Sequence, residues 1–240
     1  MKISFVETDN IRKLVKAMGA LEGRDAEIPG LGLIYGRAGL GKTKAVSWYA
    51  VNHDSIYLRG AALWTPHWML TDLCAELRQY PERYTAQLFG QVMKALKKSD
   101  RPVFIDEADY LLRDSRMLDT VRDLHDKTNI PIVLIGMEQI TGKLIRKGQF
   151  WSRLSQIIEF QPLTPGEIAF LAKTWANLKT EAGASEILRK ATAGDFREVT
   201  VALYHLERMA KANKSDAITE VMVRSLMKKT ALGRKDHEEG

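Results

Sequence analysis

Apolar and polar residues alternate along the first two thirds of the chain in a pattern that predicts strands and helices in turn. Short apolar runs bounded by turn residues predict five buried strands, at 31–36, 55–60, 103–107, 132–136 and 156–160. Between them, apolar residues recur every three or four positions, as on the buried face of a helix, and two such helices precede the third strand. This alternation indicates an α/β fold in which a parallel five-stranded sheet has helices on both faces.

The pattern changes at Gln161-Pro162-Leu163-Thr164-Pro165, after which no further strand is predicted. Thr164 as a cap, Pro165 in the first helical position and Glu167 in the third are typical of a helix start. Further helices are predicted from the apolar spacing that follows. We therefore predict an α/β domain over 1–163, a small all-helical lid domain over 164–230, and a flexible charged tail over 231–240.

One segment carries a phosphate-binding motif between a predicted strand and a predicted helix. The motif G-x-x-x-x-G-K-[ST] is matched by Gly36, Arg37, Ala38, Gly39, Leu40, Gly41, Lys42 and Thr43. Its glycines let backbone N–H groups converge on phosphates, its lysine places a cation against them, and its threonine hydroxyl can ligate Mg²⁺. The helix that follows turns its positive N-terminal end toward the same ligand. The motif predicts a site for ATP and Mg²⁺.

A second motif lies at the end of the third predicted strand. The apolar run Val103-Phe104-Ile105 ends in Asp106 and Glu107. In open α/β sheets, ligands bind beyond the carboxyl ends of the strands, so this acidic pair should share a crevice with the phosphate loop. We expect Asp106 to hold the Mg²⁺ and Glu107 to orient the attacking water. The alternative is a strand followed by acids that cap a helix.

Composition narrows the cellular setting and the partners. No stretch approaches the ~20 apolar residues of a membrane span, and the N-terminus lacks the features of a signal peptide. Cys74 is the only cysteine, which excludes an internal disulfide and fits a reducing cytoplasm. The net charge of +6 favours a polyanionic partner, although a basic tail alone could produce it, and basic residues are concentrated near the C-terminus.

The order of these features resembles that of the AAA+ ATPases. The phosphate loop, the acidic strand end, a strand at 132–136, an arginine at Arg153 before the last strand and a helical lid from Pro162-Leu163 follow one another as in that class. The chain opens with Phe5-Val6-Glu7-Thr8, an amphipathic helix over about 9–21, and the run Gly32-Leu33-Ile34-Tyr35-Gly36. This opening resembles the ATPase body of the phage Mu transposition protein B and TnsC-like family.

The resemblance implies roles for further residues. Arg153 would be the finger that reaches the γ-phosphate of a neighbouring subunit, with Arg146 as the second choice, and guanidinium chemistry suits that role. Arg197, within Gly194-Asp195-Phe196-Arg197, would contact the phosphates of its own subunit. For each, an exposed surface arginine is the alternative. The end of the fourth strand lacks the usual polar sensor residue; Glu138 or Thr141 would substitute, and we expect slow hydrolysis.

The resemblance also implies a function. The chain would bind double-stranded DNA without sequence preference, oligomerise on it as a ring or helical filament, and recruit and stimulate a transposase, with ATP hydrolysis driving disassembly. It would be encoded by a phage or transposon. Alternatives are an AAA+ replication initiator or helicase loader, and a nucleotide-gated interaction module with negligible hydrolysis.

The DNA-binding surface is not fixed by the sequence. The Mu protein carries a DNA-binding domain ahead of its ATPase, and we expect none here, because only about thirty residues precede the first strand. The ATPase body would then contact DNA. Exposed basic residues are candidates, and each could equally be an ordinary solvated charge. They are Lys97, Lys98, Arg113, Arg116, Lys143, Arg146 and Lys147.

Overall fold

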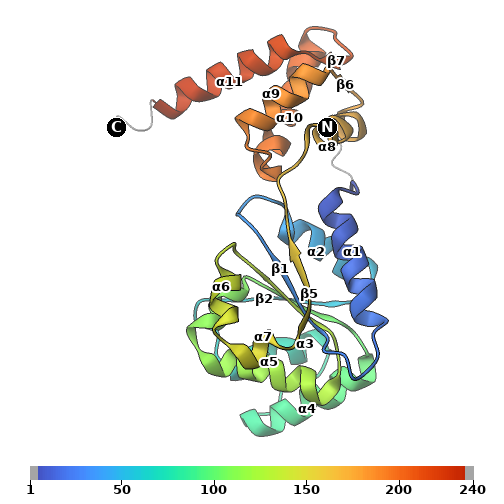
Figure 1. Ribbon diagram of the computed structural model, residues 1–240, viewed down its shortest axis with the longest axis vertical. Coiled ribbons are helices and arrows are strands. Elements are labelled where there is room, and N and C mark those ends of the chain that lie inside the picture. The colour runs from blue at the N-terminus through green and yellow to red at the C-terminus, as the bar shows by residue number, and fades with distance from the viewer. Residues whose placement is uncertain (1–4, 236–240) are drawn as a thin grey trace. The chain divides into compact units, whose positions relative to one another are not determined.

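The structure, a computed structural model, describes residues 5–235 and contains a five-stranded parallel sheet (Figure 1). The strands lie in the order β2-β3-β4-β1-β5. Their bounds are β1 Leu31–Tyr35, β2 Ile56–Arg59, β3 Val103–Asp106, β4 Ile132–Gly136 and β5 Leu154–Glu159. All five predicted strands are confirmed, although β5 begins two residues earlier than predicted because Leu154 already pairs with Leu31.

Helices cover both faces of this sheet. In chain order they are α1 Asp9–Glu22, α2 Lys42–Asn52, α3 Pro66–Glu76, α4 Thr85–Ser99, the 3₁₀ turn η1 Ala108–Arg113, α5 Ser115–Thr128, α6 Ile140–Ile145 and α7 Gly148–Trp151. Figure 1 shows α4 and α5 on one side of the sheet and α1 on the other. The two helices predicted between the second and third strands are confirmed as α3 and α4.

The alternation of side chains along the strands decides which residues meet which helices. Leu58 of β2 and Ile105 of β3 belong to a buried cluster with the apolar faces of α3, α4 and α5. Successive strand residues point to opposite faces, so Tyr57, Arg59 and Asp106 point to the face covered by α1 and α2. This parity places the carboxylate that ends β3 beside the helix that follows the phosphate loop.

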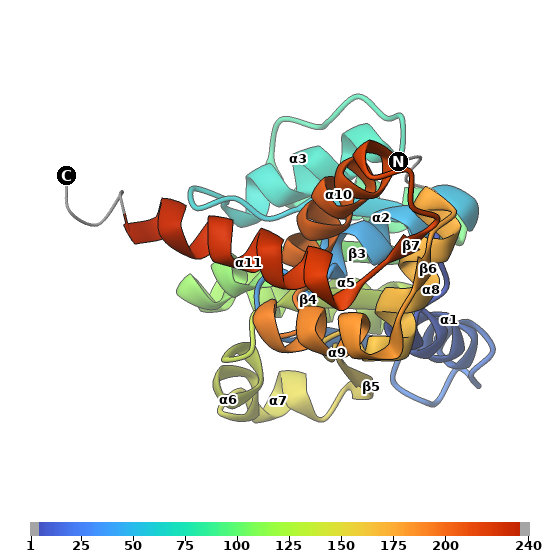
Figure 2. The ribbon, with the colours of Figure 1, turned by 90° about the horizontal axis from the view of Figure 1, so that it is seen from above.

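A second, largely helical group of elements follows the sheet. It consists of α8 Pro165–Ala176, β6 Lys179–Thr180, α9 Ala182–Ala191, α10 Phe196–Ala212, β7 Ala217–Ile218 and α11 Glu220–Lys235. The capping box predicted at the start of α8 is present, with Thr164 and Glu167 bonded reciprocally. Figure 2 shows α11 beside α9 and β6 beside β7. Ile168, Leu171, Leu203 and Leu206 are among its buried core residues.

Two details of this group differ from the sequence prediction. Its only predicted elements were helices, yet β6 and β7 form a parallel pair of two residues each, which is too short to leave a periodic pattern. Helix α11 continues to Lys235, so residues 231–235 of the predicted tail are helical; Ala231 and Leu232 favour helix and no proline interrupts it. Residues 236–240 of that tail lie outside the described residues.

Contacts divide the described chain into two compact units. One contains Asn10–Ala38 and Lys42–Phe160, and therefore the whole sheet. The other contains residues 5–9, Gly39–Gly41 and 161–235.

None of the helices in residues 5–235 has the combined length and apolar character that crossing a membrane requires.

Candidate functional site

The phosphate loop joins the end of β1 to the start of α2. All three of its glycines have positive φ: 149° for Gly36, 83° for Gly39 and 85° for Gly41. Residues that carry a side chain rarely adopt such values. Lys42 and Thr43 then form the first turn of α2, where unpaired N–H groups and the helix dipole favour an anion. The loop therefore has the backbone conformation that the motif requires.

Lys42 turns its ammonium group back into this loop. Its Nζ donates hydrogen bonds of 2.7 Å to the carbonyl oxygens of both Gly36 and Arg37, and the side chain is buried. Burial lowers the pKa of Lys42 because desolvation disfavours the charged form, while Asp106, Asp109 and Glu107 act in the opposite direction. The ammonium thus lies within the curve of the loop, on the side of the acidic residues.

Asp106 is the most constrained carboxylate of the site. It is buried at the end of β3, and its Oδ2 accepts hydrogen bonds from Thr43 Oγ1 at 2.7 Å and from the Tyr57 hydroxyl at 2.8 Å. Its Oδ1 accepts a third bond, of 2.8 Å, from the Glu107 backbone N–H. The structure therefore brings together Thr43 and Asp106, the two residues predicted to hold Mg²⁺.

Glu107 adopts an unusual backbone conformation directly after β3. Its φ of 53° and ψ of 37° are left-handed, which costs a residue with a side chain roughly 1–2 kcal/mol. Its Oε1 lies 3.4 Å from Nη2 of Arg59, the last residue of β2, and 38% of the Glu107 side chain is exposed. The strained backbone turns this carboxylate out of the strand and toward solvent, while Asp106 stays buried.

A pocket of about 780 Å³ opens beside these carboxylates. It is lined by side chains from the phosphate loop, from η1 and from the segment after β4, including Arg37, Glu107, Asp109, Arg113, Glu138 and Lys143. Asp109 Oδ2 accepts a 2.7 Å hydrogen bond from the Met137 backbone N–H. The polar group at the end of β4 is therefore supplied by Asp109 of η1, a residue that the sequence did not single out. Glu138 is exposed and Thr141 Oγ1 bonds weakly to its carbonyl, at 3.4 Å.

The three arginines with predicted phosphate roles lie in different surroundings. Arg153 directly precedes β5 and so lies at the amino ends of the parallel strands, whereas the phosphate loop lies at their carboxyl ends. Its Nε is 2.8 Å from Asp126 Oδ1 of α5. Arg146 directly follows α6 and is exposed. Arg197 is exposed in the first turn of α10. Their roles toward phosphate stay predictions.

The basic residues predicted to contact DNA separate into groups. Arg113 and Lys143 line the pocket beside Glu107, and the Arg113 guanidinium lies over the Tyr110 ring at 4.7 Å. Arg116 is paired with Asp114 at 2.7 Å. Lys97 and Lys98 occupy the last turn of α4, where they complement the helix dipole. This turn lies at the amino ends of the strands, away from the phosphate loop. Arg146 and Lys147 are exposed after α6.

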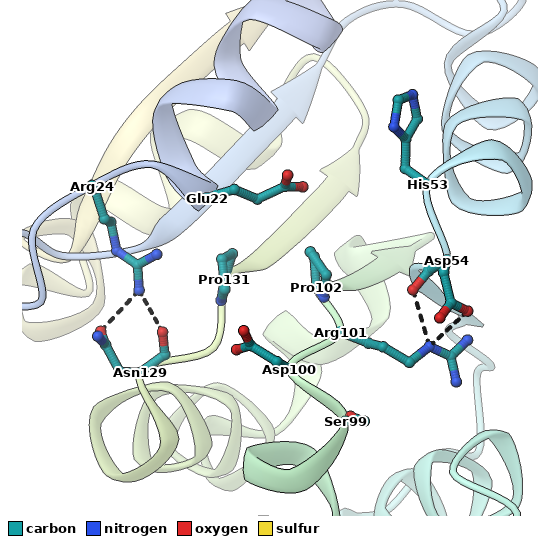
Figure 3. A pocket seen from close by; sticks show the side chains of 10 residues that line it. All are labelled: Glu22, Arg24, His53, Asp54, Ser99, Asp100, Arg101, Pro102, Asn129 and Pro131. Carbon is teal, nitrogen blue, oxygen red and sulfur yellow. Dashed lines mark hydrogen bonds and ion pairs between the residues drawn. The ribbon is translucent and has the colours of Figure 1, made fainter.

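A smaller pocket, of about 400 Å³, lies at the amino ends of the strands (Figure 3). The two arginines in it are already engaged. Arg24 donates to the Asn129 side chain at 2.8 Å, and Arg101 pairs with Asp54 at 3.2 Å. Both guanidinium groups thereby bond the residues that follow the C-termini of α5 and α2, where positive charge is favourable. These contacts tie loops together at the amino ends of the strands, away from the phosphate loop.

The residues of the first site suit a nucleoside triphosphate with Mg²⁺. The loop offers backbone N–H groups and an ammonium for phosphate, while Thr43 and Asp106 offer the oxygen ligands that Mg²⁺ prefers. Within the described residues there is no cluster of three or more His, Cys, Asp or Glu side chains that could hold a metal alone. Mg²⁺ is usually held by one or two protein groups together with substrate phosphates, and Thr43 and Asp106 could supply those groups.

Three residues of this site were missed by the sequence analysis: Tyr57, Arg59 and Asp109. Tyr57 and Arg59 lie on β2, and their contacts depend on β2 pairing beside β3, with Arg59 opposite Asp106. A polar group at alternate positions of an otherwise apolar strand, Ile56-Tyr57-Leu58-Arg59, was the available signal. Asp109 follows the acidic pair closely enough in sequence to have been included.

Comparisons with known proteins agree with this geometry. The family model of the AAA domain matches residues 26–144. The Mu-like prophage FluMu DNA transposition protein B of Haemophilus influenzae is 24% identical over 213 residues, which span 82% of this chain and 70% of that protein.

Solved structures show the same fold at low sequence identity. The ORC2 protein of Aeropyrum pernix, solved in ADPNP–ADP complexes, superposes with a TM-score of 0.68 at 17% identity, covering 95% of this chain and 68% of that one. The RuvB Holliday junction branch migration motor of Thermotoga maritima gives 0.57 at 21% identity, covering 93% and 70%. The α/β sheet with its phosphate loop and acidic strand end, the domain match and the similarity over most of the chain all lead to one family. The chain contains an AAA domain, and its similarity over most of its length supports an AAA+ ATPase of the type represented by TnsC and Mu transposition protein B.

Proposed function

We propose that this chain is an ATP-dependent, DNA-binding regulator of transposition that assembles on target DNA and recruits a transposase. The observation that carries the proposal is the 24% identity to a Mu-like transposition protein B across 82% of the chain. In this proposal ATP binding promotes assembly on duplex DNA. Slow hydrolysis, stimulated by DNA or by the transposase, then ends the assembly.

The nucleotide would be held by the phosphate loop. Backbone N–H groups of Gly36–Thr43 would bind the phosphates, and Lys42 would exchange its bonds to the loop carbonyls for bonds to phosphate oxygens. Thr43 and Asp106 would hold Mg²⁺, which when bound neutralises charge on the transferred phosphoryl group. Glu107, which the strained backbone turns out of β3, would accept a proton from the attacking water and orient it.

Two contacts support slow basal turnover. Glu107 Oε1 lies 3.4 Å from the Arg59 guanidinium, so this carboxylate oxygen would have to leave the contact before it could bind the attacking water. Asp109 already accepts a hydrogen bond from the Met137 N–H. The exposed Glu138 is then the remaining carboxylate of the pocket lining at the end of β4. A partner that draws Arg59 away from Glu107 would raise turnover.

Assembly would couple nucleotide to DNA. Arg153, or Arg146 as the alternative, would reach the nucleotide of a neighbouring subunit, and for Arg153 this requires exchanging its bond to Asp126 for one to phosphate. Each subunit would contribute few DNA contacts, with Arg113 and Lys143 beside the pocket as the leading candidates. Several subunits on one duplex would multiply these contacts without any new type of interaction.

DNA retention measured with ATP, ADP or no nucleotide tests this proposal. We expect tight retention only with ATP, no sequence preference, and a steep loss between about 50 and 200 mM salt, because binding releases counterions from several subunits at once. Electron microscopy of the ATP sample should show rings or filaments. Equal DNA affinity in all three nucleotide states would contradict nucleotide-dependent assembly and would leave constitutive binding by the basic C-terminal segment as the explanation.

Two alternatives are separated by other measurements. A replication initiator or helicase loader would share the fold and the assembly, and an adjacent transposase gene decides for transposition. A nucleotide-gated module with negligible hydrolysis would tolerate Glu107→Ala in every DNA-binding and disassembly assay. In the proposed regulator the same variant should prolong the assembly.

A further inference from the structure

One of the three hydrogen bonds that hold Asp106 comes from a residue outside both sequence motifs. The Tyr57 hydroxyl donates to Oδ2 at 2.8 Å, and Thr43 Oγ1 donates to the same oxygen at 2.7 Å. The Glu107 N–H occupies one acceptor position of Oδ1. A carboxylate accepts about four hydrogen bonds, two at each oxygen, so Oδ2 is filled and the remaining position is on Oδ1.

The fold itself fixes the position of Tyr57. In the register of the parallel pair, Tyr57 lies opposite Phe104 and Arg59 lies opposite Asp106, so the phenol extends along the sheet toward the next residue on the same face. The Tyr57 side chain is half-buried there, and Ser47, one helical turn after Thr43 on α2, lies near its hydroxyl. Tyr57 is therefore held between α2 and β3.

The chemistry of the phenol restricts it to the role of donor. A phenol carries one hydroxyl hydrogen, and the Tyr57 hydroxyl donates it to Asp106 Oδ2 at 2.8 Å. What it can do is restrict the rotation of the Asp106 carboxylate and keep Oδ2 occupied.

We propose that Tyr57 is a positioning residue for the Mg²⁺ site, an inference that rests on the ATP-binding function proposed above. By holding Oδ2 together with Thr43, Tyr57 keeps Oδ1 as the oxygen with capacity left for hydrated Mg²⁺. The hydroxyl hydrogen of Thr43 is directed at the same oxygen of Asp106, which leaves the lone pairs of Thr43 Oγ1 for the metal. Groups that orient metal ligands in this way typically change metal affinity or activity about 10- to 100-fold when they are removed.

The test is a Mg²⁺ titration of the full chain with Tyr57→Phe, which removes only the hydroxyl. Binding of a fluorescent ATP analogue is measured in EDTA and then with increasing Mg²⁺. We expect the Mg²⁺ midpoint to rise about 10-fold or more, while the affinity for the analogue in EDTA stays within about 2-fold. Competition by Mn²⁺, followed through the free-ion EPR signal, gives a second measure of metal affinity that does not depend on turnover.

The chain offers a matched control in Tyr49→Phe. Tyr49 is also buried and also donates to a carboxylate, Glu22 Oε1 at 3.2 Å, but Glu22 lies away from the phosphate loop at the end of α1. Tyr49→Phe should leave the Mg²⁺ midpoint unchanged. Thermal unfolding of both variants shows whether a change in metal affinity accompanies a general loss of stability.

The outcomes separate this inference from the proposed function. A Mg²⁺ midpoint of Tyr57→Phe equal to that of Tyr49→Phe, in a parent chain that binds the analogue, overturns the role of Tyr57 and leaves ATP binding standing. An equal rise in both variants also overturns it, because the effect would then come from lost stability. Failure of the parent chain to bind the analogue at all overturns the proposed function, and the inference with it.

Discussion

Replacing Lys42 with alanine should weaken nucleotide binding by an amount that the structure bounds. The ammonium donates two hydrogen bonds of 2.7 Å, to the Gly36 and Arg37 carbonyls, and on binding it would exchange them for bonds to phosphate. A hydrogen bond to a charged group contributes about 1.5–3 kcal/mol, and we count one net contact because the loop bonds are given up. The expected loss of affinity is therefore roughly 10- to 150-fold.

The assay is a fluorescence titration of an ATP analogue with the parent, Lys42→Ala and Lys44→Ala. Lys44 is an exposed lysine in the same turn of α2 and controls for the loss of one positive charge. Because burial lowers the pKa of Lys42, the parent should also lose affinity as pH rises, at a lower pH than an exposed lysine would give. Equal affinities of Lys42→Ala and the parent would refute the assignment of the phosphate loop, and equal losses in the two variants would reduce the effect to net charge.

Three further predictions concern the carboxylates and a buried histidine. Glu107→Gln should keep Mg·ATP binding but suppress phosphate release, because it preserves shape without the base; unchanged release would place the base elsewhere. Arg59→Ala should raise basal phosphate release while altering the free energy of unfolding by less than about 1 kcal/mol, as the Arg59–Glu107 pair is exposed; unaltered release would show that the pair does not restrain Glu107. His125 accepts from the Gly30 N–H at 3.0 Å and contacts the Ile130 carbonyl at 2.8 Å, and burial lowers its pKa. The unfolded chain then binds a proton that the folded chain excludes, so urea unfolding should show stability falling as pH drops below about 6.5, and His125→Gln, but not exposed His205→Gln, should remove that dependence.

Features coded by neighbouring residues were predictable from the sequence, and features made by pairing between strands were not. The phosphate loop and the acidic strand end are each contiguous, so Thr43 and Asp106 could be assigned to one site before their 2.7 Å contact was known. Tyr57 and Arg59 reach the carboxylates only because β2 lies next to β3, which the chain order does not determine. The β6–β7 pair was missed for a related reason, since two residues per strand carry no period.

The same distinction applies to Asp109 and to the left-handed backbone of Glu107. Asp109 reaches the Met137 N–H, 28 residues further along the chain, and no local pattern records such a contact. Nothing in the letters Asp106-Glu107 shows that one carboxylate stays buried while a positive φ turns the other outward. The sequence identified the chemical groups, and the packing of neighbouring strands determined how each group is held.

The helical unit is discontinuous in the sequence, and this limits how the protein can be dissected. Val6 is part of its core, and the backbone N–H of Asp9 bonds at 2.8 Å to Glu167, the same residue whose other carboxylate oxygen closes the capping box of α8. A fragment expressed from residue 161 onward would therefore lack one of its own core side chains, and a deletion of residues 5–9 would remove a contact to α8, 158 residues further along the chain. Fragments intended for separate expression need residues 5–9 joined back to α8, for example by circular permutation.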